Sequence, residues 1–325
     1  MRALIHSEFG DPAQVLSVEE LPVPEPGPRE VRLRVVLATI HNHDLWTVRG
    51  TYGYKPELPA RAGTEAVGIV DAVGAEVEGI EVGQRVATGG TFGAWAEYVI
   101  AKAGAVVPVP DSIPDEVAAQ LIAMPFSAIT LVDFLGVESG DVIAQNTANG
   151  AVGRLVAQIG ASRGITVIGI VRRASDVGEL ASEGISNIVS TDDDGWKDRV
   201  RELAGDRPIR AAVDSVGGSA AGDLLHLLGE GGTLVSFGAM ASDRMQLSSG
   251  DLIFKQAVVK GFWGSKVSAA MPGESQRALF GELFQLVGSG KLTLPVDSIH
   301  PLDDIADAVA ASTRPGRVGK VLLRP

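Results

Sequence analysis

The 325-residue chain contains no cysteine. Its composition therefore excludes disulfide bonds, thiolate catalysis and zinc sites built from cysteine. The chain also lacks an apolar run near the roughly 20 residues that a transmembrane helix needs. Its N-terminal segment, Met1-Arg2-Ala3-Leu4-Ile5-His6, has no long apolar core of the signal-peptide type. We therefore expect a cytoplasmic protein.

Positive charge is also in short supply. The 28 Lys and Arg residues face 40 Asp and Glu residues, which gives a formal net charge of −12. This balance argues against nucleic acid or an anionic membrane as the main partner. Apolar residues make up 45% of the chain, a normal share for a globular protein. The length is enough for two domains. Since nucleic acid and membranes are disfavoured, we expect a small molecule as the partner.

The pattern of apolar residues divides the chain into two domains. Up to residue 122, short β-branched runs are interrupted by Gly and Pro, which predicts a mostly-β domain. From residue 123 to 263, helical stretches alternate with continuous apolar strands, which predicts a parallel sheet covered on both faces. The expected strands are residues 141–145, 166–171, 188–190, 211–216, 232–237 and 257–262. The segment 264–325, with a helix and a final strand, is expected to rejoin the first domain.

A glycine-rich turn follows the first strand of the predicted parallel sheet. Its spacing is Ala148-x-Gly150-x-x-Gly153, with alanine in place of the usual first glycine. Such a turn brings backbone amides close to the pyrophosphate of a dinucleotide at a helix N-terminus. The alternative is a glycine turn that serves only close packing of helix and strand. The residues expected to bind the cofactor here are Asn149, Gly150, Ala151, Val152 and Gly153.

Two arginines, Arg172 and Arg173, end the second strand of this sheet. An enzyme that uses NAD usually has Asp or Glu at this position to bind the ribose hydroxyls. A carboxylate repels a 2′-phosphate, whereas a guanidinium forms charge-assisted hydrogen bonds with it. The sequence therefore predicts NADPH as the cofactor, unless both arginines are merely solvated surface residues.

Several short motifs, in the right order, resemble the medium-chain dehydrogenase/reductase family. They are Gly63-Thr64-Glu65-Ala66-Val67-Gly68, Gly83-Gln84-Arg85-Val86, Ala211-Ala212-Val213-Asp214-Ser215-Val216-Gly217-Gly218 and Gly232-Thr233-Leu234-Val235-Ser236-Phe237-Gly238. The resemblance implies an α/β fold, in which a Rossmann doubly wound parallel sheet is joined to a GroES-like mostly-β catalytic domain. It also implies that Phe237, Gly238, Phe262 and Trp263 belong to the NADPH site.

The resemblance points to the zinc-free branch of that family. In zinc relatives a Cys and the His of a Gly-His-Glu motif bind the catalytic metal, and here His41 and Thr64 occupy those positions. A metal site made of His41, His43 and Asp44 is the alternative. A catalytic zinc site needs three protein ligands, and we favour hydrogen-bonding roles for both histidines. No metal is therefore expected.

Within this branch the chain is similar to quinone oxidoreductases and trans-2-enoyl-thioester reductases. The motifs that support this similarity are Gln145-Asn146-Thr147-Ala148-Asn149, Gly50-Thr51-Tyr52-Gly53 with Pro56-Glu57-Leu58-Pro59, and Lys260-Gly261-Phe262-Trp263. The resemblance assigns the proton donor to Tyr52, and Tyr54, two residues further on, is the alternative but lacks the motif match. It implies NADPH-dependent reduction of an activated C=C bond or a quinone: an enone, a quinone or a 2-enoyl thioester.

His43 departs from the enoyl-reductase pattern and is the second catalytic candidate, as a proton relay. It keeps open a zinc-free alcohol or aldehyde oxidoreductase as an alternative function. The resemblance also leaves a non-catalytic NADPH-binding protein open, since the family contains such members.

The last strand of the parallel sheet, 257–263, has an exposed edge that needs a partner. In the family this edge pairs with its copy, so a homodimer is expected, with a tetramer as the alternative.

Overall fold

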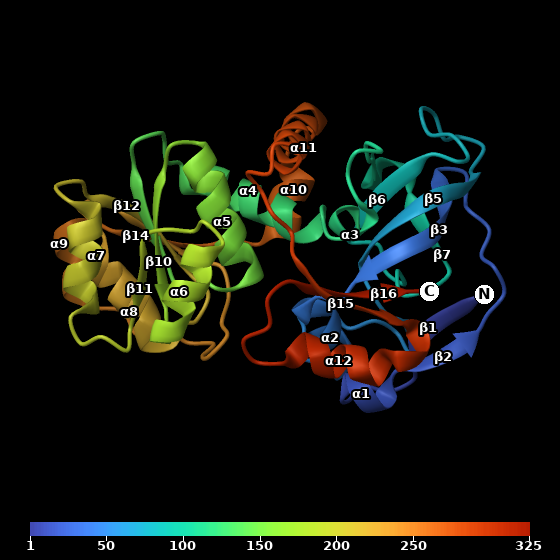
Figure 1. Ribbon diagram of the computed structural model, residues 1–325, viewed down its shortest axis with the longest axis horizontal. Coiled ribbons are helices and arrows are strands. Elements are labelled where there is room, and N and C mark those ends of the chain that lie inside the picture. The colour runs from blue at the N-terminus through green and yellow to red at the C-terminus, as the bar shows by residue number, and fades with distance from the viewer. The chain divides into compact units, whose positions relative to one another are not determined.

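The computed structural model describes residues 1–325, which form two compact units (Figure 1). Unit 1 comprises Met1–Ala123 and Thr293–Pro325, and unit 2 comprises Met124–Leu292. The division at Ala123 lies one residue from the expected one. The return to unit 1 comes later than expected, because residues 264–292 belong to unit 2.

Helix α11 (Gly273–Gly288) explains this difference at the second boundary. Phe280 of α11 stacks on Phe126 of α4 (Ala123–Leu135), with ring centroids 4.4 Å apart. Glu282 of α11 forms an ion pair with Arg163. These contacts attach the helix to unit 2, and only the chain from Thr293 onward returns to the first unit.

Unit 1 is mostly β structure, as expected. Its largest sheet has the order β15-β16-β3-β5-β6-β8, with β7 also paired to β3, and a smaller sheet has the order β2-β1-β4. The elements are β1 (Arg2–His6), α1 (Pro12–Val15), β2 (Ser17–Glu20), β3 (Glu30–Thr39), α2 (Asn42–Arg49), β4 (Ala60–Arg61), β5 (Glu65–Val73), β6 (Arg85–Gly89), β7 (Tyr98–Lys102), η1 (Ala103–Ala105), β8 (Val106–Pro108), α3 (Asp115–Ala118), β15 (Val296–Pro301), η2 (Leu302–Asp304), α12 (Ile305–Thr313) and β16 (Lys320–Arg324).

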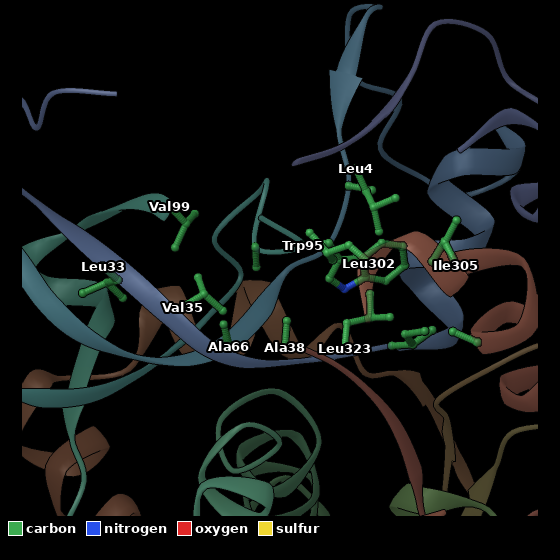
Figure 2. Packing of buried hydrophobic residues seen from close by; sticks show 14 of the residues in the cluster. Leu4, Leu33, Val35, Ala38, Ala66, Trp95, Val99, Leu302, Ile305 and Leu323 are labelled. Atoms are coloured by element: carbon green, nitrogen blue, oxygen red, sulfur yellow. The ribbon is translucent and has the colours of Figure 1, made fainter. Parts of the chain in front are cut away.

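The core of unit 1 forms around Trp95, which is fully buried. Its indole Nε1 donates a hydrogen bond of 3.0 Å to the carbonyl oxygen of Thr39 at the end of β3. Figure 2 shows Leu302, Ile305 and Leu323 from the C-terminal segment near this ring. The C-terminal strand therefore completes the core that the N-terminal strands begin.

Unit 2 contains a six-stranded parallel sheet with the order β11-β10-β9-β12-β13-β14. Its elements are α4, β9 (Val142–Gln145), α5 (Ala151–Ser162), β10 (Thr166–Val171), α6 (Ala174–Ser182), β11 (Ile188–Ser190), α7 (Trp196–Ala204), β12 (Ile209–Asp214), α8 (Gly218–Leu227), β13 (Thr233–Ser236), α9 (Ser249–Lys255), β14 (Val258–Gly261), α10 (Gly264–Ala270) and α11.

The strand order of unit 2 reverses beside β9, because β10 and β11 follow on one side and β12 to β14 follow on the other. In doubly wound sheets, ligands bind at the carboxyl ends of the strands next to such a reversal. The sheet is the Rossmann arrangement that the sequence predicted. No helix of the chain has both the length and the apolar character needed to cross a bilayer.

Candidate dinucleotide and proton-transfer sites

The glycine turn lies at the carboxyl end of β9, beside the point where the strand order reverses. A Cβ atom on Gly153 would lie 2.5 Å from the carbonyl oxygen of Thr147 and 2.9 Å from Cα of Ala148. Only glycine fits there without moving backbone. Thr147 has a φ of 50°, an uncommon value for a β-branched residue. Ala148, which replaces the usual first glycine, is fully buried.

Helix α5 begins immediately after this turn, with Gly150 as its N-cap. The first backbone N–H groups of a helix have no partner within the helix, and they attract anions. The structure brings the predicted residues Asn149 to Gly153 together at this end. The Nδ2 atom of Asn149 donates a hydrogen bond of 2.9 Å to Asp176. This hydrogen bond holds the turn in place, and the backbone N–H groups that follow Gly150 are available to a phosphate.

The two predicted arginines have different surroundings. Arg173 is the N-cap of α6, and its guanidinium pairs with Asp176 at 2.7 Å. Its pKa is raised by this hydrogen bond and by the charge of the same carboxylate. The side chain of Arg172 is exposed and has no ion-pair partner. Arg172 is therefore the guanidinium that is free to bind a phosphate at the end of β10.

The remaining predicted cofactor residues follow β13 and β14. The backbone N–H groups of Phe237 and Gly238 both donate to the carbonyl oxygen of Asp214, at 2.7 and 3.2 Å. The ring of Phe262 is buried and lies 5.8 Å from that of Phe237, whereas Trp263 is 67% exposed. All four residues lie at the carboxyl edge that carries the glycine turn, since the strands are parallel.

A buried polar pair that the sequence motifs did not single out lies beneath this edge. Asn146 Nδ2 donates to Asp214 Oδ1 at 2.5 Å, and Asn146 Oδ1 accepts from the backbone N–H of Ser215 at 2.7 Å. Asp214 is fully buried and also accepts from the backbone N–H groups of Val216 and Gly217. The pair ties the loop after β9 to the loop after β12. The feature of the sequence that could have indicated this pair is Asp214, a carboxylate at the end of an apolar strand.

The proton-transfer candidates lie in unit 1, around the start of α2. His41 is the N-cap, and its backbone N–H donates to Asp44 Oδ2 at 2.9 Å. Thr64 donates its hydroxyl hydrogen to Asp44 Oδ1 at 2.7 Å, and His43 Nε2 lies 2.8 Å from the same hydroxyl oxygen. Asp44 and Thr64 are both buried. The structure thus links His43 to a buried carboxylate through one hydroxyl group.

Tyr52, the predicted proton donor, follows α2 and is 38% exposed. Its ring centroid lies 5.9 Å from that of His43, so the structure brings the two catalytic candidates together. Partial burial, and then the charge of Asp44, raise the pKa of Tyr52. The phenol therefore keeps its proton at neutral pH, as a donor must. Tyr54 instead packs on Phe92, with ring centroids 4.6 Å apart.

A second buried network contains residues that the sequence analysis did not select. His41 Nε2 lies 2.5 Å from Glu65 Oε2, and Glu65 Oε1 accepts from the N–H groups of Ile122 and Ala123. Burial raises the pKa of Glu65 to about 7 and lowers that of His41 well below its usual range. Burial, followed by the charge of Arg317, lowers the pKa of the nearby Lys320 to about 8. Glu65 belongs to the Gly63-Thr64-Glu65 motif, which is the feature of the sequence that could have indicated this network.

These contacts leave no set of ligands suited to zinc. The Nε2 atom of His41 is hydrogen-bonded to Glu65, and the Nε2 atom of His43 is hydrogen-bonded to Thr64. The two imidazole rings stack with centroids 5.0 Å apart rather than converging on one point. No group of three His, Cys, Asp or Glu side chains in the chain is arranged to hold a metal ion.

Comparison with known families gives two matches. The zinc-binding dehydrogenase model matches residues 151–279, and the alcohol dehydrogenase GroES-like domain model matches residues 27–111. The chain is 34% identical over 330 residues to a human protein named mitochondrial enoyl-[acyl-carrier-protein] reductase, an alignment that covers 99% of this chain and 88% of the human protein.

Solved structures also match the chain over its whole length. Quinone oxidoreductase from Escherichia coli, complexed with NADPH, matches with a TM-score of 0.89 and 25% identity over 100% of both chains. A mycobacterial protein complexed with NADPH matches with a TM-score of 0.88 and 29% identity, again over 100% of both chains.

Proposed function

Because the chain belongs to the medium-chain dehydrogenase/reductase family, we propose that it uses NADPH to reduce an activated C=C bond or a quinone without a metal ion. The observation that carries this proposal is Arg172, an unpaired guanidinium at the end of β10 where an NAD enzyme has a carboxylate. The NADPH complexes of two similar proteins support the cofactor. The names of the similar proteins support quinones or 2-enoyl thioesters as substrates.

The cofactor fits the donor groups of unit 2. The free amides after Gly150 suit a pyrophosphate, and Arg172 suits a 2′-phosphate. When bound, NADPH supplies the hydride that adds to the β-carbon of the substrate. The protein must then provide a proton and stabilise the negative charge that develops on the carbonyl oxygen. Tyr52 is the proposed donor, since its phenol stays protonated at neutral pH.

A second candidate function is a zinc-free alcohol or aldehyde oxidoreductase. The observation in its favour is the hydrogen-bonded series from His43 through Thr64 to Asp44, which suits proton transfer to and from an alcohol oxygen. A non-catalytic NADPH-binding protein would need neither this series nor Tyr52.

The assembly proposed for this chain is a homodimer formed at the edge of β14. One side of this strand has no partner strand in the sheet, and an open edge favours pairing with a second copy. Val258 of β14 is apolar and exposed, as are Ile253 and Phe254 of α9, which precedes this strand in the chain. A cytoplasmic location stays a prediction from the sequence, and the human relative is named as mitochondrial.

The proposal is tested by following NADPH absorbance with purified protein and a panel of acceptors. The panel holds 2-enoyl thioesters, quinones, enones and aldehydes, with NADH run in parallel and metal content measured on the same sample. We expect turnover of at least one of the first three classes and a lower KM for NADPH than for NADH. Turnover of aldehydes alone would favour the second candidate. NADPH binding without any turnover would favour the non-catalytic alternative.

A further inference from the structure

The hydroxyl group of Thr64 sets the direction of the hydrogen bonds around His43. It lies 2.7 Å from Asp44 Oδ1 and 2.8 Å from His43 Nε2, and it has a single hydrogen to give. An ionised carboxylate can only accept hydrogen bonds. The hydroxyl hydrogen therefore points to Asp44, and the oxygen of Thr64 is left to accept a hydrogen from His43. It follows that His43 carries a proton on Nε2.

Asp44 is held in this arrangement by a second donor. Its Oδ2 accepts the backbone N–H of His41, the N-cap residue of α2, at 2.9 Å. The carboxyl group is almost fully buried, so no water competes for its oxygens. Both acceptor oxygens are thus fixed by their partners.

We propose that Thr64 and Asp44 are positioning residues that keep His43 in the Nε2–H tautomer, so that Nδ1 is the nitrogen that gains and loses protons. Nδ1 has no hydrogen-bond partner, the side chain of His43 is partly exposed, and its ring centroid lies 5.9 Å from that of Tyr52. The catalytic part of this inference rests on the proposed function, whereas the tautomer does not.

The proton balance of the resulting step is simple. After Tyr52 gives its proton to the reduced substrate, a phenolate remains. Nδ1 takes a proton from solvent and passes it to this phenolate, which restores the phenol and the neutral imidazole. The proton on Nε2 stays on the ring throughout, because Nε2–H donates a hydrogen bond to the hydroxyl oxygen of Thr64. The reaction of His43 consumes one solvent proton per turnover and needs no other reactant.

The tautomer is tested by NMR of the full chain labelled with ¹⁵N in the histidine rings, with His43→Gln used to assign the signal. We expect the neutral ring of His43 to show the Nε2–H pattern in the wild type and in Thr64→Ser. In Asp44→Asn, the amide oxygen keeps the N–H of His41, and the amide nitrogen turns to Thr64. The hydroxyl must then donate to His43, so the signal should change to Nδ1–H. Thr64→Val, which is isosteric, should give a mixture of both tautomers.

An Nδ1–H pattern in the wild type, or no change in Asp44→Asn, would overturn the positioning role. For the catalytic part, kcat should fall at least about tenfold in Asp44→Asn and Thr64→Val and recover in Thr64→Ser, with the KM for NADPH nearly constant. An unchanged kcat in both variants would overturn it. The NMR measurement needs no substrate, so it determines the tautomer of His43 independently of turnover. If the wild type turns over no acceptor, that result counts against the proposed function and not against the tautomer.

Discussion

The Nε2 atom of His41 lies 2.5 Å from Oε2 of Glu65, and both side chains are buried. Burial lowers the pKa of His41 well below its usual range, so the imidazole is neutral, and a single hydrogen joins its Nε2 atom to the carboxyl group of Glu65. Its other nitrogen, Nδ1, is buried without a hydrogen-bond partner. Glu65 holds this ring beside His43 and also accepts the backbone N–H groups of Ile122 and Ala123.

The raised pKa of Glu65 makes the stability of the protein depend on pH. In the folded chain burial raises this pKa from 4.5 to about 7, so between these values the folded state holds a proton that the unfolded state has lost. The contribution of Glu65 to the free energy of unfolding therefore falls as pH rises through this window. Since one pKa unit corresponds to about 1.4 kcal/mol, the full effect is roughly 3 kcal/mol.

Glu65→Gln should remove this dependence. Denaturant unfolding at pH 5 and pH 8 should show the wild type losing roughly 2 to 3 kcal/mol relative to the variant as pH rises. The lowered pKa of His41 acts in the opposite direction below its usual value of 6.5, but it is common to both proteins. Glu78→Gln, at an exposed position, is the control and should parallel the wild type. Parallel curves for Glu65→Gln would show that Glu65 is ionised throughout.

The sequence predicted the fold well because its signals are local. Alternating helices and apolar strands identify a Rossmann sheet without knowledge of distant contacts. The second domain boundary was misplaced because nothing within α11 indicates that Phe280 will stack on Phe126. The networks of Glu65 and Asp214 join segments far apart in the chain, which a local pattern does not reveal. The ion pair between Arg173 and Asp176 is predictable from the sequence, because the two residues lie three apart at the start of one helix.

Arg172 and Arg173 should differ in their effect on cofactor choice. Arg172→Ala removes a free guanidinium, and we expect the KM for NADPH to rise roughly tenfold or more, the equivalent of one charge-assisted hydrogen bond. The KM for NADH should hardly change. Arg173→Ala is the matched comparison, and its smaller expected effect follows from the existing pair with Asp176. Equal increases for both cofactors in Arg172→Ala would contradict a 2′-phosphate contact.

Tyr52→Phe should lower kcat about a hundredfold, because it removes the proposed proton donor and retains the ring. The KM for NADPH should stay the same, since the cofactor residues lie in unit 2. Tyr54→Phe is the control, because that ring packs on Phe92 and its hydroxyl has no proposed role. The measurement is steady-state kinetics with the best acceptor from the panel. Full kcat in Tyr52→Phe would remove Tyr52 from the mechanism.

Gly153→Ala should destabilise unit 2 and prevent NADPH binding. The added methyl group would lie 2.5 Å from the carbonyl oxygen of Thr147, so the turn must move at a cost of about 1–3 kcal/mol. Gly178→Ala, in the interior of α6, meets no atom within 4 Å and should instead raise stability by about 0.5–1 kcal/mol. Thermal unfolding with and without NADPH measures both effects. A Gly153→Ala protein with wild-type stability and cofactor affinity would show that the turn has room.

Phe254→Asp should convert the expected dimer to a monomer. Phe254 is 84% exposed on α9, which precedes the edge strand β14 in the chain, and an exposed apolar ring gains free energy when a partner covers it. A carboxylate placed on both sides of a two-fold interface adds like-charge repulsion to the lost burial. Val82→Asp changes an equally apolar exposed residue of unit 1 and should leave the assembly intact. Analytical ultracentrifugation of the three proteins gives the answer: a wild-type monomer, or a Phe254→Asp dimer as stable as the wild type, would mean that this edge is not the interface.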